Sequence, residues 1–244
     1  MKKEYINDIN EIKAILRDAD HAVFFGGAGM STASGIPDFR GASGLYTVSD
    51  EPAEYFLSRE CLVGEPERFF EFYREKMLYP DALPNEAHHA LARLEAEGVI
   101  KAVITQNIDG LHQMAGSERV IELHGTVSRS FCDRCGRTFT PEAITEGERV
   151  PKCPYCGGVI RPDVTLYGEP LSSRAFSDAE EEIAASDVLI VGGSSLTVQP
   201  AASLVGDFSG DHLIIVNYSP TPYDGMAEYI IRESLTEVFE ELVK

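Results

Sequence analysis

The chain has 244 residues, 43% hydrophobic and 25% charged, which is the composition of a globular protein and excludes a disordered one. Its 40 acidic and 21 basic side chains give a formal net charge of −19. That charge argues against non-specific nucleic-acid binding, which needs a basic surface. It is compatible with cationic partners such as lysine-rich peptide segments.

No apolar stretch reaches the roughly 18 residues that a membrane-spanning helix needs. The first 20 residues carry acidic side chains and lack an uninterrupted apolar core, so they are not typical of a secretory signal. We find no lipidation motif. The expected location is therefore the cytoplasm.

Helical and strand patterns alternate along most of the chain. Apolar residues at helical spacing predict a first helix over 5–18, before a buried strand over 22–25 that breaks into a glycine-rich turn. Further strands are expected over 99–104, 188–191 and 213–216. Their nearly continuous apolar character is typical of a parallel sheet that is buried on both faces.

Helices are expected between these strands, over 86–97 with Gly98 as the terminating glycine, over 178–185 and over 236–243. This alternation predicts an α/β fold with a doubly wound, Rossmann-like parallel sheet. Two stretches interrupt it and predict a smaller domain. We assign 48–79 to a helical module, 127–161 to a zinc module, and 1–47, 80–126 and 162–244 to the Rossmann-like part.

Four of the five cysteines form two Cys-x2-Cys pairs, Cys132 with Cys135 and Cys153 with Cys156, separated by 17 residues. This spacing is typical of a structural zinc site, and a reducing compartment disfavours the alternative of two disulfides. Each pair is followed by a glycine, which favours a tight knuckle around the metal. Four thiolates fill the tetrahedron, so the zinc is expected to be structural rather than catalytic. Cys61 is expected to be a small buried residue.

Polar residues cluster where the predicted strands end. Because the carboxyl ends of parallel strands form the ligand crevice of an open sheet, we expect these clusters to converge. The first cluster is the glycine-rich turn 27–32, which suits the binding of a phosphate. Thr32 stands where a third glycine would complete the dinucleotide-binding fingerprint, so a plain tight turn without a ligand is the alternative. Residues 34–41 are either a loop over the ligand or an ordinary surface turn.

The second cluster is 106–112, whose amide and carboxylate side chains suit an amide, a ribose hydroxyl or a water. The third is His124, which lies between the two predicted domains, where a cleft is expected. Of the other histidines, His88 and His89 are expected to pack or face solvent, and His112 to pack or orient the second cluster.

Seven segments in this order resemble the sirtuins, the NAD-dependent protein-lysine deacylases: GAGMSTASGIPDFRG, TQNIDGLH, ELHG, the paired Cys-x2-Cys, YGE, GGSSLTVQP and IVN. The resemblance covers most of the chain, from about Val23 to Asn217. It implies a Rossmann-like domain, a smaller domain with a zinc and a helical module, and a compact bacterial-type enzyme that we expect to be a monomer. Departures include Gly26, where the family usually has threonine.

The resemblance also implies roles for individual residues. His124 is the expected general base, and Asn107 and Asp109 are expected to join it in catalysis. The expected NAD contacts are Ala28, Gly29, Thr32, Phe39, Arg40, Gln106, Asn107, Ile108, Asp109, His124, Gly193, Ser194, Ser195 and Asn217, with an adenine contact of undetermined register in Arg232–Ser234. The segment Pro162–Tyr167 resembles the edge to which an acyl-lysine peptide adds as a strand.

The implied reaction transfers the acyl group of a lysine to the ADP-ribose part of NAD. Nicotinamide leaves, the acyl oxygen attaches to the ribose, and water releases lysine and O-acyl-ADP-ribose. Sirtuins that prefer acidic acyl groups have a Tyr-x-x-Arg pair, whereas this chain has Tyr73 and Lys76. Lysine lacks the bidentate fork of arginine, so we expect neutral acyl groups to be preferred.

Two other functions stay open at this point. The same fold could act as a mono-ADP-ribosyltransferase or an NAD hydrolase, which only the products distinguish. A non-enzymatic zinc-ribbon interaction module is disfavoured by the net charge and by the polar residues at the strand ends.

Overall fold

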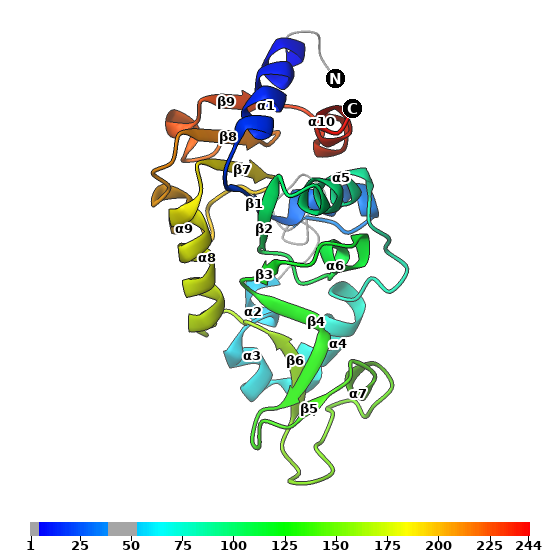
Figure 1. Cartoon of the computed structure of the whole chain (residues 1–244). Coiled ribbons are helices and arrows are strands. Elements are labelled where there is room, and N and C mark those ends of the chain that lie inside the picture. The colour runs from blue at the N-terminus through cyan, green and yellow to red at the C-terminus, as the bar shows by residue number, and fades with distance from the viewer. Residues whose placement is uncertain (1–4, 39–52) are drawn as a thin grey trace.

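The computed structural model describes residues 5–38 and 53–244. Its larger part is a six-stranded parallel sheet with the order β3-β2-β1-β7-β8-β9 (Figure 1). The predicted strands are confirmed as β1 (Ala22–Gly26), β2 (Ile100–Thr105), β7 (Val188–Gly192) and β8 (His212–Val216). Sequence analysis missed the two edge strands, β3 (Val120–Glu122) and β9 (Tyr229–Ile231). Each has only three residues, too few for a periodic pattern.

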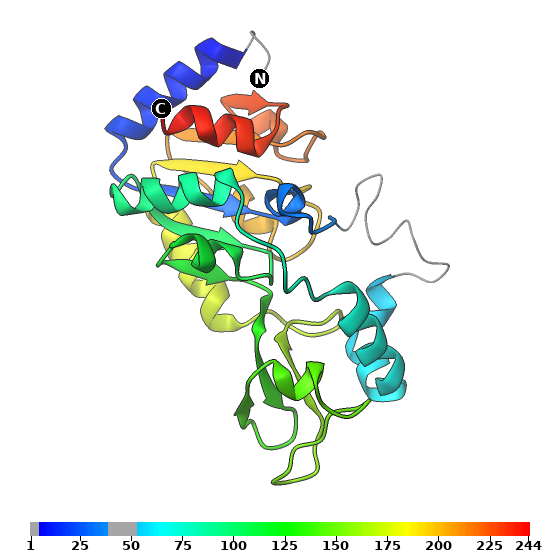
Figure 2. The ribbon, with the colours of Figure 1, turned by 90° about the vertical axis from the view of Figure 1, so that its right-hand side faces the viewer.

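Helices cover both faces of this sheet. On one face lie α1 (Ile6–Asp18), α5 (Glu86–Ala96), α6 (Leu111–Ala115) and α10 (Leu235–Leu242), with α5 and α10 nearest the viewer in Figure 2. On the other lie α8 (Ser173–Ala185) and α9 (Ser203–Gly206). The helix α8 begins five residues earlier than predicted. Its N-cap is Ser172, whose side chain accepts a hydrogen bond from the Ala175 amide. Gly98 follows α5 with a φ of 77°, as expected of a terminating glycine.

Consecutive residues of the central strand face the two helical layers in turn. Phe24 packs edge-on against Phe239 of α10, with ring centroids 5.5 Å apart. Phe25 belongs to the core on the opposite face, together with Ile183 of α8 and Leu204 of α9. Each such buried side chain contributes about 1.5–3 kcal/mol to stability. The sheet is therefore a rigid frame whose carboxyl edge is held in place from both sides.

The smaller part combines a three-stranded antiparallel sheet with short helices. The sheet has the order β5-β4-β6, from β5 (Thr138–Phe139), β4 (Gly125–Cys132) and β6 (Ile160–Val164). Its helices are α2 (Ala53–Phe56), α3 (Arg59–Gly64), α4 (Pro66–Lys76) and α7 (Glu142–Thr145). In the larger part, short 3-10 turns span Ala28–Met30, Thr32–Ser34 and Asp224–Met226.

One hydrophobic core joins the helical and zinc modules of the smaller part. Phe69 and Phe70 of α4 pack in the same buried cluster as Ile144 of α7 and Ile160 of β6. Cys61 is buried in this cluster, as expected. The strand β6 extends through Val164, so the stretch from 162 onward, which we assigned to the Rossmann-like part, begins within the small sheet. Across the described ranges, no helix is both long and apolar enough to span a bilayer.

Candidate active site

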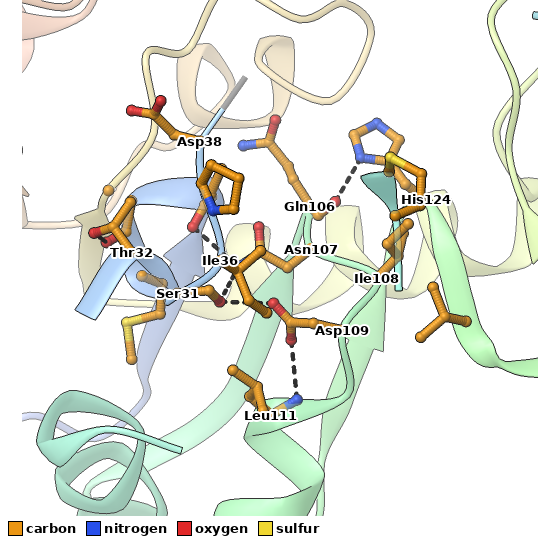
Figure 3. A pocket seen from close by; sticks show the side chains of 18 of the residues that line it. Ser31, Thr32, Ile36, Asp38, Gln106, Asn107, Ile108, Asp109, Leu111 and His124 are labelled. Atoms are coloured by element: carbon orange, nitrogen blue, oxygen red, sulfur yellow. Dashed lines mark hydrogen bonds between the residues drawn. The ribbon is translucent and has the colours of Figure 1, made fainter. Parts of the chain in front are cut away.

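A cavity of about 1130 Å³ runs between the carboxyl edge of the large sheet and the smaller part. Residues from all three polar clusters line it, and Figure 3 shows several of them converging. The volume slightly exceeds the roughly 300–1,000 Å³ usual for a single small ligand. It leaves room for a dinucleotide together with an inserted side chain.

Glycines let the turns after β1 and β7 approach each other closely. A Cβ on Gly29 would lie 2.7 Å from the Cα of Gly193, a separation that real Cβ atoms essentially never show. The Gly29 amide donates a 2.8 Å hydrogen bond to the Gly193 carbonyl. Sequence analysis attributed the glycines of this turn to the approach of a phosphate. In the structure, Gly29 and Gly193 are required by contact between the two turns themselves.

Asn107 and Asp109 belong to one hydrogen-bond network with Ser31. Asn107 Nδ2 donates to Ser31 Oγ at 3.0 Å and to the Gly27 carbonyl at 3.1 Å. Ser31 Oγ in turn donates to Asp109 Oδ2 at 2.6 Å, and the Leu111 amide donates to Asp109 Oδ1 at 2.9 Å (Figure 3). Burial raises the pKa of Asp109, and the hydrogen bonds from Ser31 and Leu111 oppose this rise without cancelling it.

His124 has a fixed proton on one ring nitrogen. Its Nδ1 lies 2.9 Å from the Gln106 carbonyl oxygen, and a carbonyl only accepts, so Nδ1 carries the hydrogen (Figure 3). In the neutral ring, Nε2 then holds the lone pair. Burial lowers the pKa of His124, which favours the neutral form at pH 7. The side chain is therefore prepared to accept a proton at Nε2.

Other predicted NAD contacts, in the turns that follow the strands of the large sheet, also line the cavity. They are Ala28, Thr32, Gln106, Ile108, Ser194, Ser195 and Asn217. Gln106 Nε2 donates to Ser194 Oγ at 2.8 Å, which ties the second cluster to the turn after β7. Phe39 and Arg40, two further predicted contacts, lie outside the described residues.

In the segment after β9, which was expected to contact adenine, the structure shows which side chains line the cavity and which do not. Arg232 is directed away from the cavity, since its guanidinium donates to the Asn217 carbonyl at 2.8 Å and pairs with Asp224. Ser234 lines the cavity, and its Oγ lies 2.6 Å from Thr236 Oγ1. Glu233 lines the cavity as well, so Glu233 and Ser234 are the residues of this segment in position to contact a ligand.

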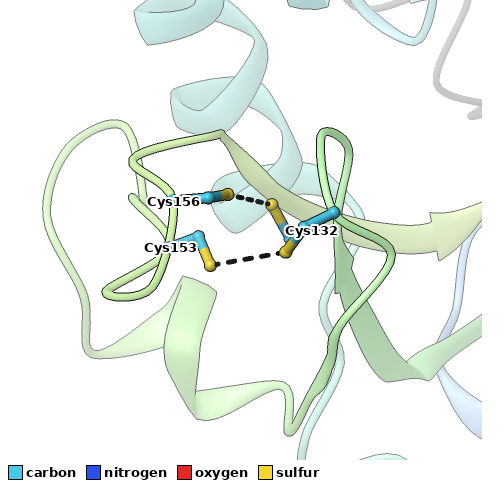
Figure 4. Close-up of side chains that lie close together, drawn as sticks. Cys132, Cys153 and Cys156 are labelled. Carbon is cyan, nitrogen blue, oxygen red and sulfur yellow. Dashed lines mark hydrogen bonds between the residues drawn. The ribbon is translucent and has the colours of Figure 1, made fainter.

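The four paired cysteines meet at one point of the smaller part, with all sulfur atoms within 4.8 Å of one another (Figure 4). Cys132 and Cys156 are 3.4 Å apart, and Cys135 and Cys153 3.9 Å. Zn–S bonds of about 2.3 Å in a tetrahedron place sulfurs roughly 3.8 Å apart, so the four thiols fit one zinc ion. The glycine after each pair has a positive φ, 69° at Gly136 and 71° at Gly157, as the predicted knuckles require.

Comparisons with known proteins agree with this geometry. The family model described as "Sir2 family" matches residues 27–200. This chain belongs to the Sir2 family. Its Sir2-family relatives include proteins named "NAD-dependent protein deacetylase" from Clostridium acetobutylicum, 47% identical over 98% of this chain and 99% of the relative, and from Cutibacterium acnes, 51% identical over 90% and 91%.

Solved Sir2 structures superpose closely on the chain. One, a Sir2 histidine variant with a deacetylated p53 peptide and 3′-O-acetyl-ADP-ribose, has a TM-score of 0.90 at 40% identity and covers 96% of both chains. Another, Sir2 with a p53 peptide and NAD⁺, has a TM-score of 0.84 at 39% identity and covers 99% of this chain and 97% of the other.

Sequence analysis of this Sir2-family chain missed Ser31 as a site residue. No local pattern indicates a role for this serine, because its hydrogen bond to Asp109 spans 78 positions of the sequence. Sequence analysis also left open what Tyr73 and Lys76 contact. Tyr73 is buried and stacks on Phe69, whereas Lys76 lines the cavity and pairs with Glu75 at 2.7 Å.

Proposed function

We propose that this protein is an NAD-dependent deacetylase of protein lysine side chains, which forms nicotinamide, O-acetyl-ADP-ribose and free lysine. The proposal is carried by two features that lie in the same cavity. One is His124 with its lone pair at Nε2, and the other is the hydrogen-bond network of Asn107, Ser31 and Asp109. The relatives named as deacetylases match nearly the whole chain, which supports the same conclusion.

On the side of the large sheet, the proposed role of the chain is to hold NAD. When bound, NAD supplies the ADP-ribosyl group that accepts the acetyl group, and nicotinamide is the leaving group. Asn107, Ile108 and Asp109 orient the carboxamide and the ribose. The hydrogen bonds to Ser31 hold the side chains of Asn107 and Asp109 rigid, so their orientation costs little entropy on binding. The remaining contacts come from Ala28, Gly29, Thr32, Phe39, Arg40, Gln106, Gly193, Ser194, Ser195 and Asn217.

His124 acts as the general base. It removes a proton from a ribose hydroxyl, which then attacks the carbon that came from the acetyl group. A base of this kind contributes about 10²–10⁴-fold to the rate. The Gln106 carbonyl keeps Nδ1 protonated and fixes the ring, so Nε2 can take the proton without a change of tautomer.

The acetyl-lysine peptide enters from the side of the smaller part. The segment Val164–Tyr167 lines the cavity and continues from β6, an edge strand of the small sheet. The edge of a sheet can accept a peptide as a further strand. The net charge of −19 supports a lysine-containing protein partner rather than a nucleic acid. We further propose a monomeric cytoplasmic enzyme that prefers neutral acyl groups, since Lys76 is already paired with Glu75.

Product analysis by mass spectrometry tests this function. The protein is incubated with NAD and matched acetyl-, butyryl- and succinyl-lysine peptides, beside a His124→Ala variant. Free lysine peptide and O-acetyl-ADP-ribose, lost in the variant, are expected. ADP-ribose attached to protein would assign a mono-ADP-ribosyltransferase instead, and faster turnover of the succinyl peptide would overturn the proposed preference. Thermal stabilisation by NAD is also expected, whereas a non-enzymatic interaction module would show none.

A further inference from the structure

The segment Val164–Tyr167 lines the cavity but has little sheet of its own to hold it, because β6 ends at Val164. Its backbone is fixed from several sides. The Thr165 amide donates to the His124 carbonyl at 2.9 Å, and the Tyr167 amide donates to the Leu57 carbonyl at 2.9 Å. Two further backbone groups of the segment are held by a buried ion pair.

The ion pair consists of Arg161 and Glu169, one on each side of the segment. Arg161 Nη2 donates to Glu169 Oε2 at 2.9 Å, and Nη1 donates to the other carboxylate oxygen, so the pair is bidentate. The Arg161 side chain is only 4% exposed and stacks over Phe131, with its guanidinium carbon 5.3 Å from the ring centroid. A buried guanidinium needs nearby acceptors, and Glu169 provides two of them.

The same two side chains hold the backbone of the segment directly. Arg161 Nη2 donates to the Val164 carbonyl at 2.7 Å, and Glu169 Oε2 accepts the Leu166 amide at 2.9 Å. The pair thus fixes a carbonyl and an amide that lie two residues apart. Neither group is then free to turn toward a bound peptide. The carbonyls of Leu166 and Tyr167 also accept hydrogen bonds within the chain, from the Glu169 and Arg59 amides at 2.9 Å each, so the chain itself fixes the conformation of the segment.

A second arginine connects this pair to the zinc module. Arg59 of α3 makes a bidentate pair with Asp133, at 2.9 and 2.7 Å, and lies 3.9 Å from Glu169. Asp133 directly follows the cysteine at position 132 and lies 4.0 Å from Arg161 Nη1. Two arginines and two carboxylates therefore alternate between the metal knuckle and the segment that lines the cavity.

We propose that Arg161 and Glu169 are positioning residues that set the backbone of Val164–Tyr167 for the acetyl-lysine peptide. This inference rests on the proposed function, since it takes that segment as the peptide edge. Neither residue is proposed to contact the reacting atoms. Weakening the pair therefore affects recognition of the peptide and leaves both NAD binding and the chemical step in place.

The test is steady-state kinetics of Glu169→Gln, with peptide and NAD varied separately. Glutamine keeps the size of the side chain but loses the charge that pairs with Arg161. We expect the KM for the acetylated peptide to rise about tenfold or more, with kcat and the KM for NAD changed less than twofold. The matched control is Glu67→Gln at an exposed site away from the segment. The Glu67 carboxylate, on α4, lies 3.1 Å from the guanidinium of Arg149 in the zinc module. This control should leave all three constants unchanged.

Glu169→Asp gives a second variant, which keeps the charge but shortens the reach to the Leu166 amide, and it should also raise the peptide KM. Circular dichroism will show whether Glu169→Gln folds. If it does not fold, Glu169→Asp serves as the test in its place. A fall in kcat with an unchanged peptide KM, or equal effects of Glu169→Gln and Glu67→Gln, would overturn the positioning role. If the unaltered protein forms no deacetylated peptide, the proposed function fails and this inference with it, whereas an active protein with insensitive variants refutes the inference alone.

Discussion

The two walls of the cavity are built by different physical means. On the wall formed by the large sheet, the site side chains follow strands that are buried on both faces, and they are held by neutral or backbone hydrogen bonds such as those of Asn107 and His124. On the opposite wall, short strands are held by a cluster of thiols and by buried ion pairs such as Arg161 with Glu169. The first wall is stabilised by packing and neutral hydrogen bonds, whereas the second adds ion pairs and a metal site to its own hydrophobic core.

This difference predicts which perturbations affect which ligand. Changes on the large-sheet wall should affect NAD chemistry, and changes on the opposite wall should affect the peptide.

The largest effect is expected for His124→Ala. Loss of the general base should lower the rate of deacetylation by about 10²–10⁴-fold, measured as free lysine peptide formed. Thermal stabilisation by NAD should persist, because the ring is only one of many contacts proposed for the dinucleotide. His89→Ala, a change at an exposed histidine of α5, is the matched control and should retain full activity. Retention of a tenth or more of the activity by His124→Ala would contradict the assigned base.

Removal of the zinc should affect the peptide wall selectively. Cys153→Ser replaces a buried ligand, and metal analysis should show a fall from one zinc per chain to substoichiometric content. We expect at least a tenfold loss of deacetylation, while NAD still raises the melting temperature of the variant. Cys61→Ala, which removes the thiol outside the metal cluster, should keep the zinc. An equal loss of NAD stabilisation would show that the two walls do not respond independently.

Mild acid should destabilise the large part first. Burial lowers the pKa of His88 to about 4 and that of His112 to about 3, against an ordinary value near 6.5. As the pH falls, these two histidines therefore take up protons in the unfolded chain before they do so in the folded protein. The free energy of unfolding should fall by about 3 kcal/mol between pH 6.5 and pH 5, measured by urea denaturation. Burial raises the pKa of Glu169, but hydrogen bonds from Arg161 and the Leu166 amide outweigh this, so its pKa lies below its ordinary value and the pair persists over that range.

The buried rings themselves provide the control for this prediction. His112 and His88 pack with centroids 4.8 Å apart, and neither ring nitrogen of His112 has a hydrogen-bond partner among the described residues. His112→Phe should therefore fold well and lose about half of the dependence on pH. A variant with the pH dependence of the unaltered protein would show that other groups cause the acid destabilisation.

The smallest effect is expected for Lys76→Ala. The ammonium group of Lys76 is paired with Glu75, and the side chain is 39% exposed, so the charge is not reserved for a ligand. The kcat/KM for an acetylated peptide should change less than twofold, and turnover of a succinylated peptide should stay low in both proteins. A large loss confined to the succinylated peptide would instead assign Lys76 to recognition of an acyl carboxylate.

The same contrast explains which features could be predicted from the sequence. The buried strands and the polar clusters at their ends follow from apolar runs and from the geometry of a parallel sheet, so the convergence of Asn107 and Ser194 was predictable. The zinc cluster follows from the spacing of its cysteines. Both kinds of signal are local in the sequence.

Contacts between distant residues were not predictable in this way. The bond from Ser31 to Asp109 and the bridge from Arg59 to Asp133 depend on how separate elements pack, and charged residues on short helices give no periodic signal. The strands β3 and β9 were missed for a related reason, since three residues show no alternation. Arg232 and Ser234 are close in sequence, and only the partner of Arg232 at Asp224 shows which of them faces the cavity.

The stoichiometry of the products, with and without peptide, tests the proposed deacetylation directly. Nicotinamide, deacetylated peptide and O-acetyl-ADP-ribose are quantified by mass spectrometry over one time course with NAD and an acetyl-lysine peptide. The proposed function predicts equal amounts of the three products, and little nicotinamide when the peptide is omitted. Nicotinamide released at the same rate without peptide, or without deacetylated peptide appearing, would contradict it.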